Sequence, residues 1–171
     1  MIFKTANELY TLVQEILLAA GASDRNAEEV AAHLVLANLS GVDTHGVWHV
    51  MGYVEAIQAT EILADTKPEI LEETPTSALI TGNWTFGHVT AAFAMDAAIE
   101  KAAKQNLALV SMVQVHHIGR LGEYAEMAVA RGMMSVVWAG GFGVEQPNAV
   151  PYGGRAPALS TNPIAMGFPA G

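Results

Sequence analysis

The hydrophobic pattern of the chain changes near residue 65, and this change constrains the fold more than any other feature of the sequence. Before it, apolar residues recur every three or four positions, which predicts helices. The first stretch of this kind places them at Leu9, Leu12, Val13, Ile16 and Leu17. After it, short apolar runs separated by glycine and proline predict strands. We therefore expect a helical N-terminal region over residues 1–75 and a partial mixed α/β domain over residues 76–171.

Local signals predict where the elements begin and end. Thr5 stands three residues before Glu8, the spacing of a capping box, and Ser23 or Asp24 can cap a second helix. A third helix is expected from about residue 45 to residue 57. Later in the chain we expect strands over 69–73, 78–81, 107–113, 133–139 and 164–171, and helices over 89–105 and 121–131. The runs over 107–113 and 133–139 are typical of buried strands, and the helix between them suggests a crossover unit in a mixed sheet.

Composition excludes several classes of protein. Apolar residues make up 51% of the 171 residues and charged residues 15%, which excludes a disordered acidic tail. The net charge of −9 would repel a phosphate backbone, so nucleic acid is not an expected partner. The absence of cysteine excludes a disulfide scaffold and a thiol nucleophile. The high apolar fraction indicates either burial in an oligomer or a missing part of the protein.

Targeting and membrane signals are not readable in the sequence. Charged residues interrupt the N-terminus at Lys4, Glu8, Glu15 and Asp24, so it lacks the apolar stretch of a signal peptide. No run of 18 apolar residues exists, so a membrane span is not expected. We expect a cytoplasmic protein with no membrane partner.

The first candidate site lies in the segment that follows the second expected helix. If residues 45–53 are helical, His45, His49 and Tyr53 are spaced four residues apart and share one face. Two imidazoles and a phenol on one face suit an acid–base and substrate-positioning site, because histidine exchanges protons near neutral pH. Two readings stay open beside this one: a metal site with Asp43 as third ligand, or two surface histidines beside a capping residue.

The second candidate site is the pair His116 and His117, which follows the apolar run that ends at Val113. In α/β proteins the ends of strands tend to carry reactive side chains. A solvated histidine pair that leads into the next helix explains the same residues equally well.

The third candidate site is rich in glycine and proline. Gly153 and Gly154 beside Arg155 can bring backbone amides and a guanidinium group toward an anion, and Thr161 and Asn162 can bind a polar ligand. A connection that needs glycine and proline for its geometry alone is the other reading. The sequence contains no Gly-x-Gly-x-x-Gly, Walker or Gly-x-Ser-x-Gly motif, so no Rossmann fingerprint, P-loop or serine hydrolase elbow is indicated.

In this order, the three sites resemble the malate/L-lactate dehydrogenase family of NAD(P)-dependent 2-hydroxyacid oxidoreductases. This family lacks a Rossmann fold and includes ureidoglycolate, sulfolactate and diketogulonate dehydrogenases. The matching segments are Thr44-His45-Gly46 with Tyr53, Gly87-His88-Val89 with Ala94-Met95, His117-Ile118-Gly119 with Gly122 and Tyr124, Pro151-Tyr152-Gly153-Gly154-Arg155, and Thr161-Asn162-Pro163.

The resemblance implies a sulfolactate dehydrogenase-like α/β fold and hydride exchange between NAD or NADP and C2 of a 2-hydroxy or 2-oxo acid. It also implies a homodimer. His45 and His117 match the catalytic histidines of the family, with His45 as proton donor and acceptor and His117 as second acid–base or oxyanion partner, or the reverse. The resemblance implies substrate contacts for Thr44, His49, Tyr53 and Arg155, cofactor contacts for Thr161, Asn162 and Pro163, and no metal ligand.

The sequence departs from the family at three points. His49 stands where the family usually has an arginine, and an imidazole cannot form the two-pronged contact of a guanidinium group with a carboxylate. Either the substrate differs, or Arg120 or Arg155 takes the place of that arginine. Ala139-Gly140-Gly141 stands where the family has Thr-Asn-Ser. The sequence also ends near the middle of a family member, so much of the cofactor contact is expected from a second half.

Three functions therefore stay open. The first is a 2-hydroxyacid dehydrogenase, present here as a truncated chain. The second is a catalytically inactive truncated or degenerate paralogue. The third is a small metal-dependent enzyme that uses Asp43, His45 and His49.

Overall fold

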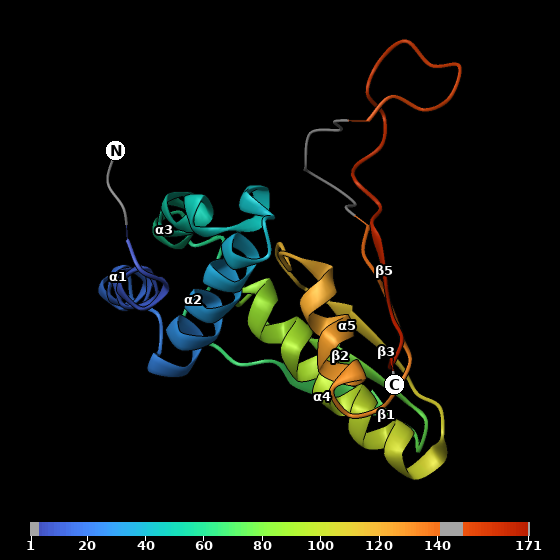
Figure 1. Cartoon of the computed structure of the whole chain (residues 1–171). Helices are drawn as coiled ribbons and strands as arrows, with labels where there is room; N and C mark the ends of the chain where they lie inside the picture. Colours follow the sequence, from blue (N-terminus) through green and yellow to red (C-terminus); the bar gives the residue numbers. More distant parts are fainter. Residues whose placement is uncertain (1–3, 141–148, 171) are drawn as a thin grey trace. The chain divides into compact units, whose positions relative to one another are not determined.

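A computed structural model describes residues 4–140 and 149–170 of the chain. It divides into two compact units, Met1–Arg120 and Leu121–Gly171. Figure 1 labels their helices and strands. The division of the sequence at residue 75 stays a prediction.

The first unit begins with helices, as the apolar spacing predicts. They are α1 (Ala6–Ala19), α2 (Asp24–Leu39) and α3 (Val50–Gln58), with two short 3₁₀ turns, Asp43–His45 and Val47–His49, before α3. The capping box at the start of α1 is present: the Thr5 hydroxyl accepts a hydrogen bond from the Glu8 N–H, and the Glu8 carboxylate accepts one from the Thr5 N–H. Ser23 caps α2 in the same way through the Asn26 N–H.

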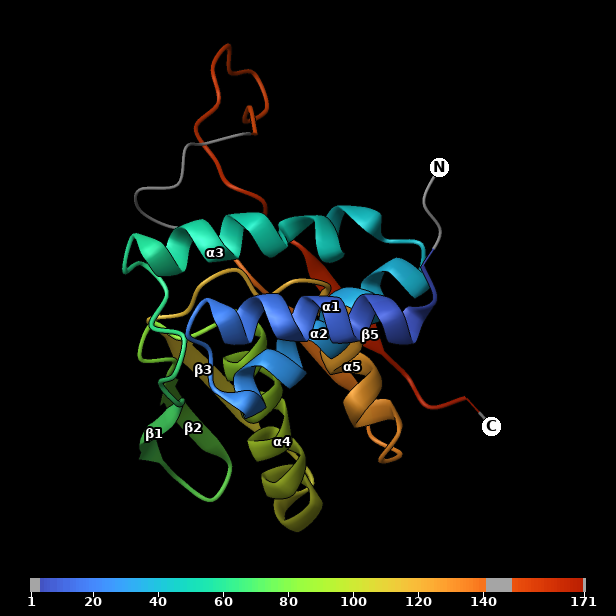
Figure 2. The same cartoon turned by 90° about the vertical axis from the view of Figure 1, so that its left-hand side faces the viewer.

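These helices pack around an apolar core. Figure 2 shows α1 and α3 running alongside each other in this unit. Their buried side chains include Val13, Leu17, Val30, Leu34, Val50 and Tyr53. Since the phenol of Tyr53 is buried in this core, its hydroxyl needs a hydrogen-bond partner inside the protein.

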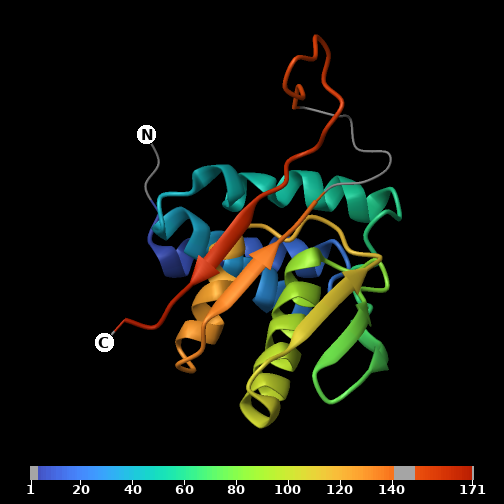
Figure 3. The ribbon, with the colours of Figure 1, turned by 90° about the vertical axis from the view of Figure 1, so that its right-hand side faces the viewer.

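A mixed sheet follows, as predicted. Its strands are β1 (Glu69–Glu73), β2 (Ser77–Thr81) and β3 (Leu109–Val113); β1 pairs with β2 antiparallel, and β2 pairs with β3 parallel. Helix α4 (Gly87–Gln105) connects the parallel strands and packs against one face of the sheet (Figure 3). The crossover of this unit therefore runs through α4, and not through the 121–131 helix as the sequence suggested.

The prediction that residues 107–113 form a buried strand is wrong. Leu109 is 55% exposed and Val113 is 41% exposed, whereas Val110 and Met112 pack toward Ala94 of α4. A strand covered by a helix on one face only leaves alternate side chains in solvent, because successive side chains point to opposite faces.

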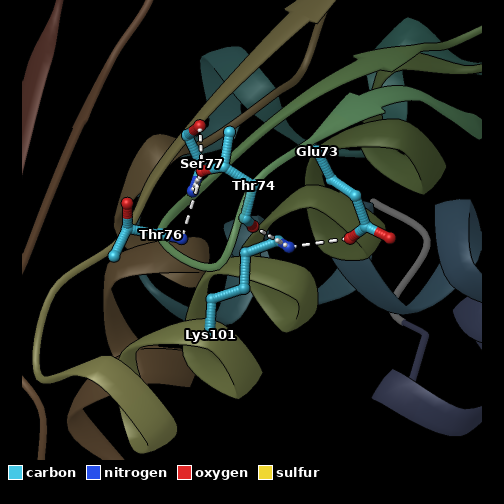
Figure 4. Close-up of polar contacts among 5 residues, drawn as sticks. All are labelled: Glu73, Thr74, Thr76, Ser77 and Lys101. Carbon is cyan, nitrogen blue, oxygen red and sulfur yellow. Dashed lines mark hydrogen bonds and ion pairs between the residues drawn. The ribbon is translucent and has the colours of Figure 1, made fainter.

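A lysine joins α4 to the turn between β1 and β2. The Lys101 ammonium group donates hydrogen bonds to the Glu73 carboxylate, at 2.7 Å, and to the Thr74 carbonyl, at 2.8 Å (Figure 4). The Thr74 hydroxyl in turn accepts hydrogen bonds from the Thr76 and Ser77 N–H groups. The Lys101 contact lowers the pKa of the Glu73 carboxyl group.

The second unit contains α5 (Leu121–Val129), β4 (Ser135–Trp138) and β5 (Ile164–Gly167). The two strands pair antiparallel, and α5 contacts both. The prediction of a buried strand over 133–139 is wrong for the same reason as in β3: Val136 is 50% exposed and Trp138 is 60% exposed. Of the Ala139-Gly140-Gly141 segment, residue 141 lies outside the described residues.

Among the residues that the structure describes, no helix combines the length and the apolarity that crossing a membrane requires.

Candidate active site

A turn, and not a helix, carries the first predicted site residue. Gly46 adopts an extended conformation (φ −92°, ψ −158°) that separates the two 3₁₀ turns, so the expectation of one continuous helix through His45 is wrong. The reason is Asn38, at the end of α2. Its side-chain oxygen accepts a hydrogen bond from the Val47 N–H at 2.9 Å, and its amide group donates to the Asp43 carboxylate. A Cβ atom on Gly46 would collide with the Asn38 side chain.

Although the helix is broken, the predicted side chains come together. The ring centroids of His45 and His117 lie 5.7 Å apart, and those of His49 and His117 lie 4.8 Å apart. The ring of His49 stacks on that of Tyr53 at 5.7 Å with an interplanar angle of 10°. Three of these residues come from the segment before and inside α3, and His117 comes from the loop after β3. We call these four residues the ring cluster.

The phenol of the ring cluster is buried and uncharged. Tyr53 is 7% exposed, and its hydroxyl lies 2.9 Å from Nδ1 of His117. Burial raises the pKa of Tyr53 well above its usual value, because the phenolate would lose its hydration. The Tyr53 hydroxyl therefore keeps its proton at neutral pH and can donate it in a hydrogen bond.

Two imidazoles of the ring cluster are also shifted toward the neutral form. Loss of hydration and the neighbouring His49, His45 and His33 lower the pKa of His117 to about 4, although part of the residue is open to solvent. The pKa of His45 is lowered by the same kind of desolvation and by His49 and His33. Both rings are therefore neutral at pH 7, and each can serve as hydrogen-bond donor and acceptor.

Hydrogen bonds to Thr44 hold the remaining parts of the turn. The Thr44 hydroxyl lies 3.0 Å from Nδ1 of His45. The Thr44 carbonyl accepts hydrogen bonds from Nε2 of His49, at 2.9 Å, and from the Trp48 indole, at 3.0 Å. One nitrogen of His49 is thus used inside the protein, which leaves Nδ1 as its contact to a substrate. Nδ1 carries a hydrogen only when the ring is doubly protonated, and even then a single donor cannot reproduce the fork of an arginine.

The structure separates the two adjacent histidines of the second candidate site. His117 enters the ring cluster, whereas His116 points to another part of the unit. Nε2 of His116 donates to the Glu61 carbonyl at 2.6 Å, and its ring lies 5.5 Å from that of Trp84. His116 therefore anchors the loop that presents His117.

Sequence reasoning assigned no role to two further histidines that lie behind the ring cluster. His88, on α4, and His33, on α2, are each 1% exposed. Nε2 of His88 lies 3.4 Å from the Tyr53 hydroxyl, and Nε2 of His33 accepts a hydrogen bond from the Arg120 N–H at 2.8 Å. In the sequence, His88 stands out only as part of a segment that resembles the family. Nothing in the spacing of His33 indicates its contact with Arg120, 87 positions away.

The geometry gives no support to the metal reading. Within residues 4–140 and 149–170, no group of three or more histidine, aspartate or glutamate side chains is placed to hold one metal ion. Asp43 instead binds the amide of Asn38, and its carboxylate belongs to the scaffold of the turn.

The other predicted site residues belong to the second unit. Arg155 is exposed and follows a turn in which the Gly154 N–H donates to the Pro151 carbonyl at 2.8 Å. Thr161, Asn162 and Pro163 are exposed and lead directly into β5. The Pro163 carbonyl accepts a hydrogen bond from the Ala139 N–H, which extends the pairing of β4 and β5 by one residue.

A separate shallow hollow of about 570 Å³ lies in the first unit, lined by Leu63, Asp65, Thr66, Lys67, Glu69, Asn83, Trp84 and Gln114. None of these residues belongs to the ring cluster. The candidate active site is therefore separate from this hollow.

The class of protein now follows from fold and site: an α/β chain with a mixed sheet, whose first unit gathers neutral imidazoles around a buried phenol. The chain belongs to the malate/L-lactate dehydrogenase family, which it matches over residues 5–171. The predicted family and the predicted fold class are both confirmed.

Individual relatives agree with this assignment. The chain is 39% identical over 159 residues to L-sulfolactate dehydrogenase of Methanothermobacter thermautotrophicus, a match that covers 93% of this chain and 46% of the relative. It is 33% identical to hydroxycarboxylate dehydrogenase B of Escherichia coli O157:H7, with 96% and 45% covered. The solved structure of malate dehydrogenase from Pyrococcus horikoshii OT3 superposes with a TM-score of 0.92 at 32% identity, covering 98% of this chain and 47% of that one. The chain thus spans about half the length of the relatives it matches.

Proposed function

We propose that the chain is part of an oxidoreductase that exchanges a hydride between NAD or NADP and C2 of a small 2-hydroxy or 2-oxo acid. The observation that carries the proposal is the ring cluster, in which His45 and His117 lie within reach of one small substrate. The names of the relatives, which include sulfolactate and malate dehydrogenases, support the same substrate class.

The proposed roles of the ring cluster follow from what the reaction needs. When a 2-oxo acid is reduced, the carbonyl oxygen must gain a proton, and an imidazole is suited to supply it. His45 is the proposed proton donor and acceptor, oriented by the Thr44 hydroxyl. His117 is the proposed second acid–base or oxyanion partner. Tyr53 acts on the substrate through His117, because its hydroxyl is bonded to that ring.

The substrate carboxylate needs a cationic or hydrogen-bonding partner, and the proposed ones are His49 and Arg155. Nε2 of His49 is bonded to the Thr44 carbonyl, so His49 can donate to a carboxylate through Nδ1 when the ring is doubly protonated. Arg155 is exposed and offers the two-pronged contact that His49 lacks.

Cofactor contacts are proposed for Thr161, Asn162 and Pro163. The hydroxyl and amide groups of Thr161 and Asn162 are exposed beside the start of β5 and have the donors and acceptors that the carboxamide of a nicotinamide requires, so the residues fit the group. When bound, the nicotinamide supplies or accepts the hydride. We further propose a cytoplasmic homodimer with domains that divide near residue 75.

The alternative is a catalytically inactive relative that keeps the fold. Two observations favour it: His49 stands in place of the arginine that the resemblance implies, and Ala139-Gly140 stands in place of the polar residues that it implies. The two proposals differ in one measurable quantity, turnover.

The test is a screen of 2-oxo acids with both reduced nicotinamide cofactors, followed by cofactor absorbance. We expect turnover with at least one acid, and we expect His45→Ala to lower it by roughly 10²–10⁴ while the melting temperature stays unchanged. The control is Glu100→Gln, at an exposed position of the same unit outside the ring cluster. Full activity of His45→Ala would contradict the role of His45, and no turnover with any acid would favour the inactive relative.

A further inference from the structure

The two buried imidazoles behind the ring cluster lie against each other. The ring centroids of His33 and His88 lie 4.5 Å apart at an angle of 63°. Complete burial, and then the neighbouring His33, His117, His49 and His45, lower the pKa of His88 well below its usual value. His88 is therefore neutral and carries a single N–H hydrogen, either on Nδ1 or on Nε2.

The surroundings of His88 decide which nitrogen carries that hydrogen. Nε2 lies 3.4 Å from the Tyr53 hydroxyl, a long hydrogen bond, whereas Nδ1 is buried and has no hydrogen-bond partner among the residues that the structure describes. A hydrogen on Nδ1 would bury a donor with nothing to receive it. Proteins tolerate a buried acceptor without a partner better than a buried N–H without one. The hydrogen therefore belongs on Nε2, which donates to the Tyr53 oxygen.

This choice fixes the direction of the next hydrogen bond. The Tyr53 oxygen accepts from His88, so its own hydrogen is directed to the closer of its two partners, Nδ1 of His117, at 2.9 Å. Nδ1 of His117 then acts as an acceptor. A neutral His117 must consequently carry its hydrogen on Nε2, the nitrogen that this chain of hydrogen bonds leaves for the substrate.

We propose that His88 is a positioning residue that acts through Tyr53 to hold His117 in the Nε2–H form, so that His117 is a neutral hydrogen-bond donor to the substrate oxygen. The inference rests on the proposed function and assigns separate roles to His45 and His117. A neutral imidazole that has given up its only hydrogen would be an imidazolate, so His117 polarises the carbonyl and stabilises the negative charge that develops on its oxygen. The transferred proton comes from His45, which must take up a second proton before the reduction, so that giving one to the substrate oxygen returns it to the neutral form.

The test reads the hydrogen positions directly and needs no substrate. Long-range ¹H–¹⁵N correlation spectra distinguish protonated from unprotonated imidazole nitrogens in the whole chain at neutral pH. We expect hydrogen on Nε2 of His88, on Nε2 of His117 and on Nδ1 of His33, whose Nε2 accepts from the Arg120 N–H. A hydrogen on Nδ1 of either His88 or His117 would overturn the inference.

Variants separate positioning from mere packing. His88→Leu removes the donor, and His88→Gln keeps an N–H donor at a similar reach; Tyr53→Phe breaks the connection while keeping the ring. We expect His88→Leu and Tyr53→Phe to give His117 a mixture of both forms and to lower kcat by roughly 10–100-fold with little change in KM. His88→Gln should restore the single form and much of kcat. Glu100→Gln, at an exposed position of α4, is the control.

The outcomes distinguish this inference from the proposed function. Turnover together with a hydrogen on Nδ1 of His117 overturns the inference alone. The expected hydrogen positions without turnover on any 2-oxo acid overturn the proposed function and, with it, the role given to His117. If His88→Leu does not fold, the spectra of the unaltered chain and of Tyr53→Phe still decide the matter.

Discussion

At the scale of single residues, the site requires a glycine at position 119, where the backbone packs closely against two buried histidines. Gly119 has φ +68°, and a Cβ atom there would collide with the His33 ring and lie 2.8 Å from His88. The loop that carries His117 therefore passes directly over the two buried imidazoles. Gly41 has a similar φ of +73°, but a Cβ atom there would meet no other atom within 4 Å.

Comparing Gly41 with Gly119 separates the cost of a left-handed backbone from the cost of a steric clash with the His33 ring. We expect Gly41→Ala to lower the free energy of unfolding by about 1 kcal/mol, since only the left-handed backbone is penalised. Gly119→Ala adds overpacking against His33, and we expect a loss of about 2–4 kcal/mol. Urea denaturation of both variants gives the comparison. Equal losses would contradict the close packing of the loop on His33.

The neutral imidazoles also predict how stability depends on pH. In the unfolded chain His117 takes up a proton near its ordinary pKa of 6.5, whereas in the folded chain it does so near 4. Between these values the unfolded state binds more protons, so the free energy of unfolding falls as the pH is lowered from about 6.5 to 4. We expect His117→Gln to reduce this slope in chemical denaturation at a series of pH values. A slope equal to that of the unaltered chain would mean that the folded protein does not hold His117 neutral.

At the scale of whole elements, one buried amide joins α2 to two distant segments. The Asn26 amide group donates to the carbonyls of Ala64 and Thr66, at 2.9 and 3.0 Å, and lies 3.2 Å from the Thr85 hydroxyl. Asn26 is 1% exposed. It therefore holds the helical part of the first unit against the segment that leads into the mixed sheet and against the turn before α4.

We expect Asn26→Leu to lower the free energy of unfolding by about 2–4 kcal/mol, because a side chain of similar volume leaves two carbonyls and a hydroxyl without their donor. Thermal and urea denaturation measure the loss. Glu28→Gln, exposed on the same helix, is the matched control and should change stability by less than about 0.5 kcal/mol. A loss below 1 kcal/mol for Asn26→Leu would show that this connection does not stabilise the first unit.

For the molecule as a whole, the uncovered faces of the strands matter most. In the second unit, Val136 pairs with Met166 and Trp138 pairs with Ile164, and all four are at least half exposed. The opposite face carries Ser135, whose hydroxyl donates to the Ala125 carbonyl of α5, and Val137 two residues later. An apolar sheet face of this kind marks a contact surface or promotes association.

Two substitutions on neighbouring residues test which face is free. We expect Val136→Lys to reduce self-association, measured by sedimentation, and to leave the melting temperature nearly unchanged. Val137→Lys places a charge against α5 and should lower the melting temperature or prevent folding, because a one-residue step moves the side chain to the covered face. Similar effects of the two substitutions would contradict the observed register.

The sequence alone determined the elements, the fold class and the family, because these depend on local spacing and on ordered motifs. The capping box at Thr5 and the apolar spacing of the first helix involve residues only a few positions apart, so the sequence alone is enough to recognise them. The same holds for the segment that contains Thr44, His45 and Gly46, which carried the resemblance.

Only the tertiary structure decided which strand faces are covered, where the helix before Tyr53 breaks, and which histidine of a pair enters the site. Asn38 breaks the helix from another element, and Glu61 draws His116 away from His117. His33 on α2 and His88 on α4 are 55 positions apart in the sequence, and no spacing links them. Each of these outcomes depends on contacts between residues far apart in the sequence, and their side chains become neighbours only when the chain packs.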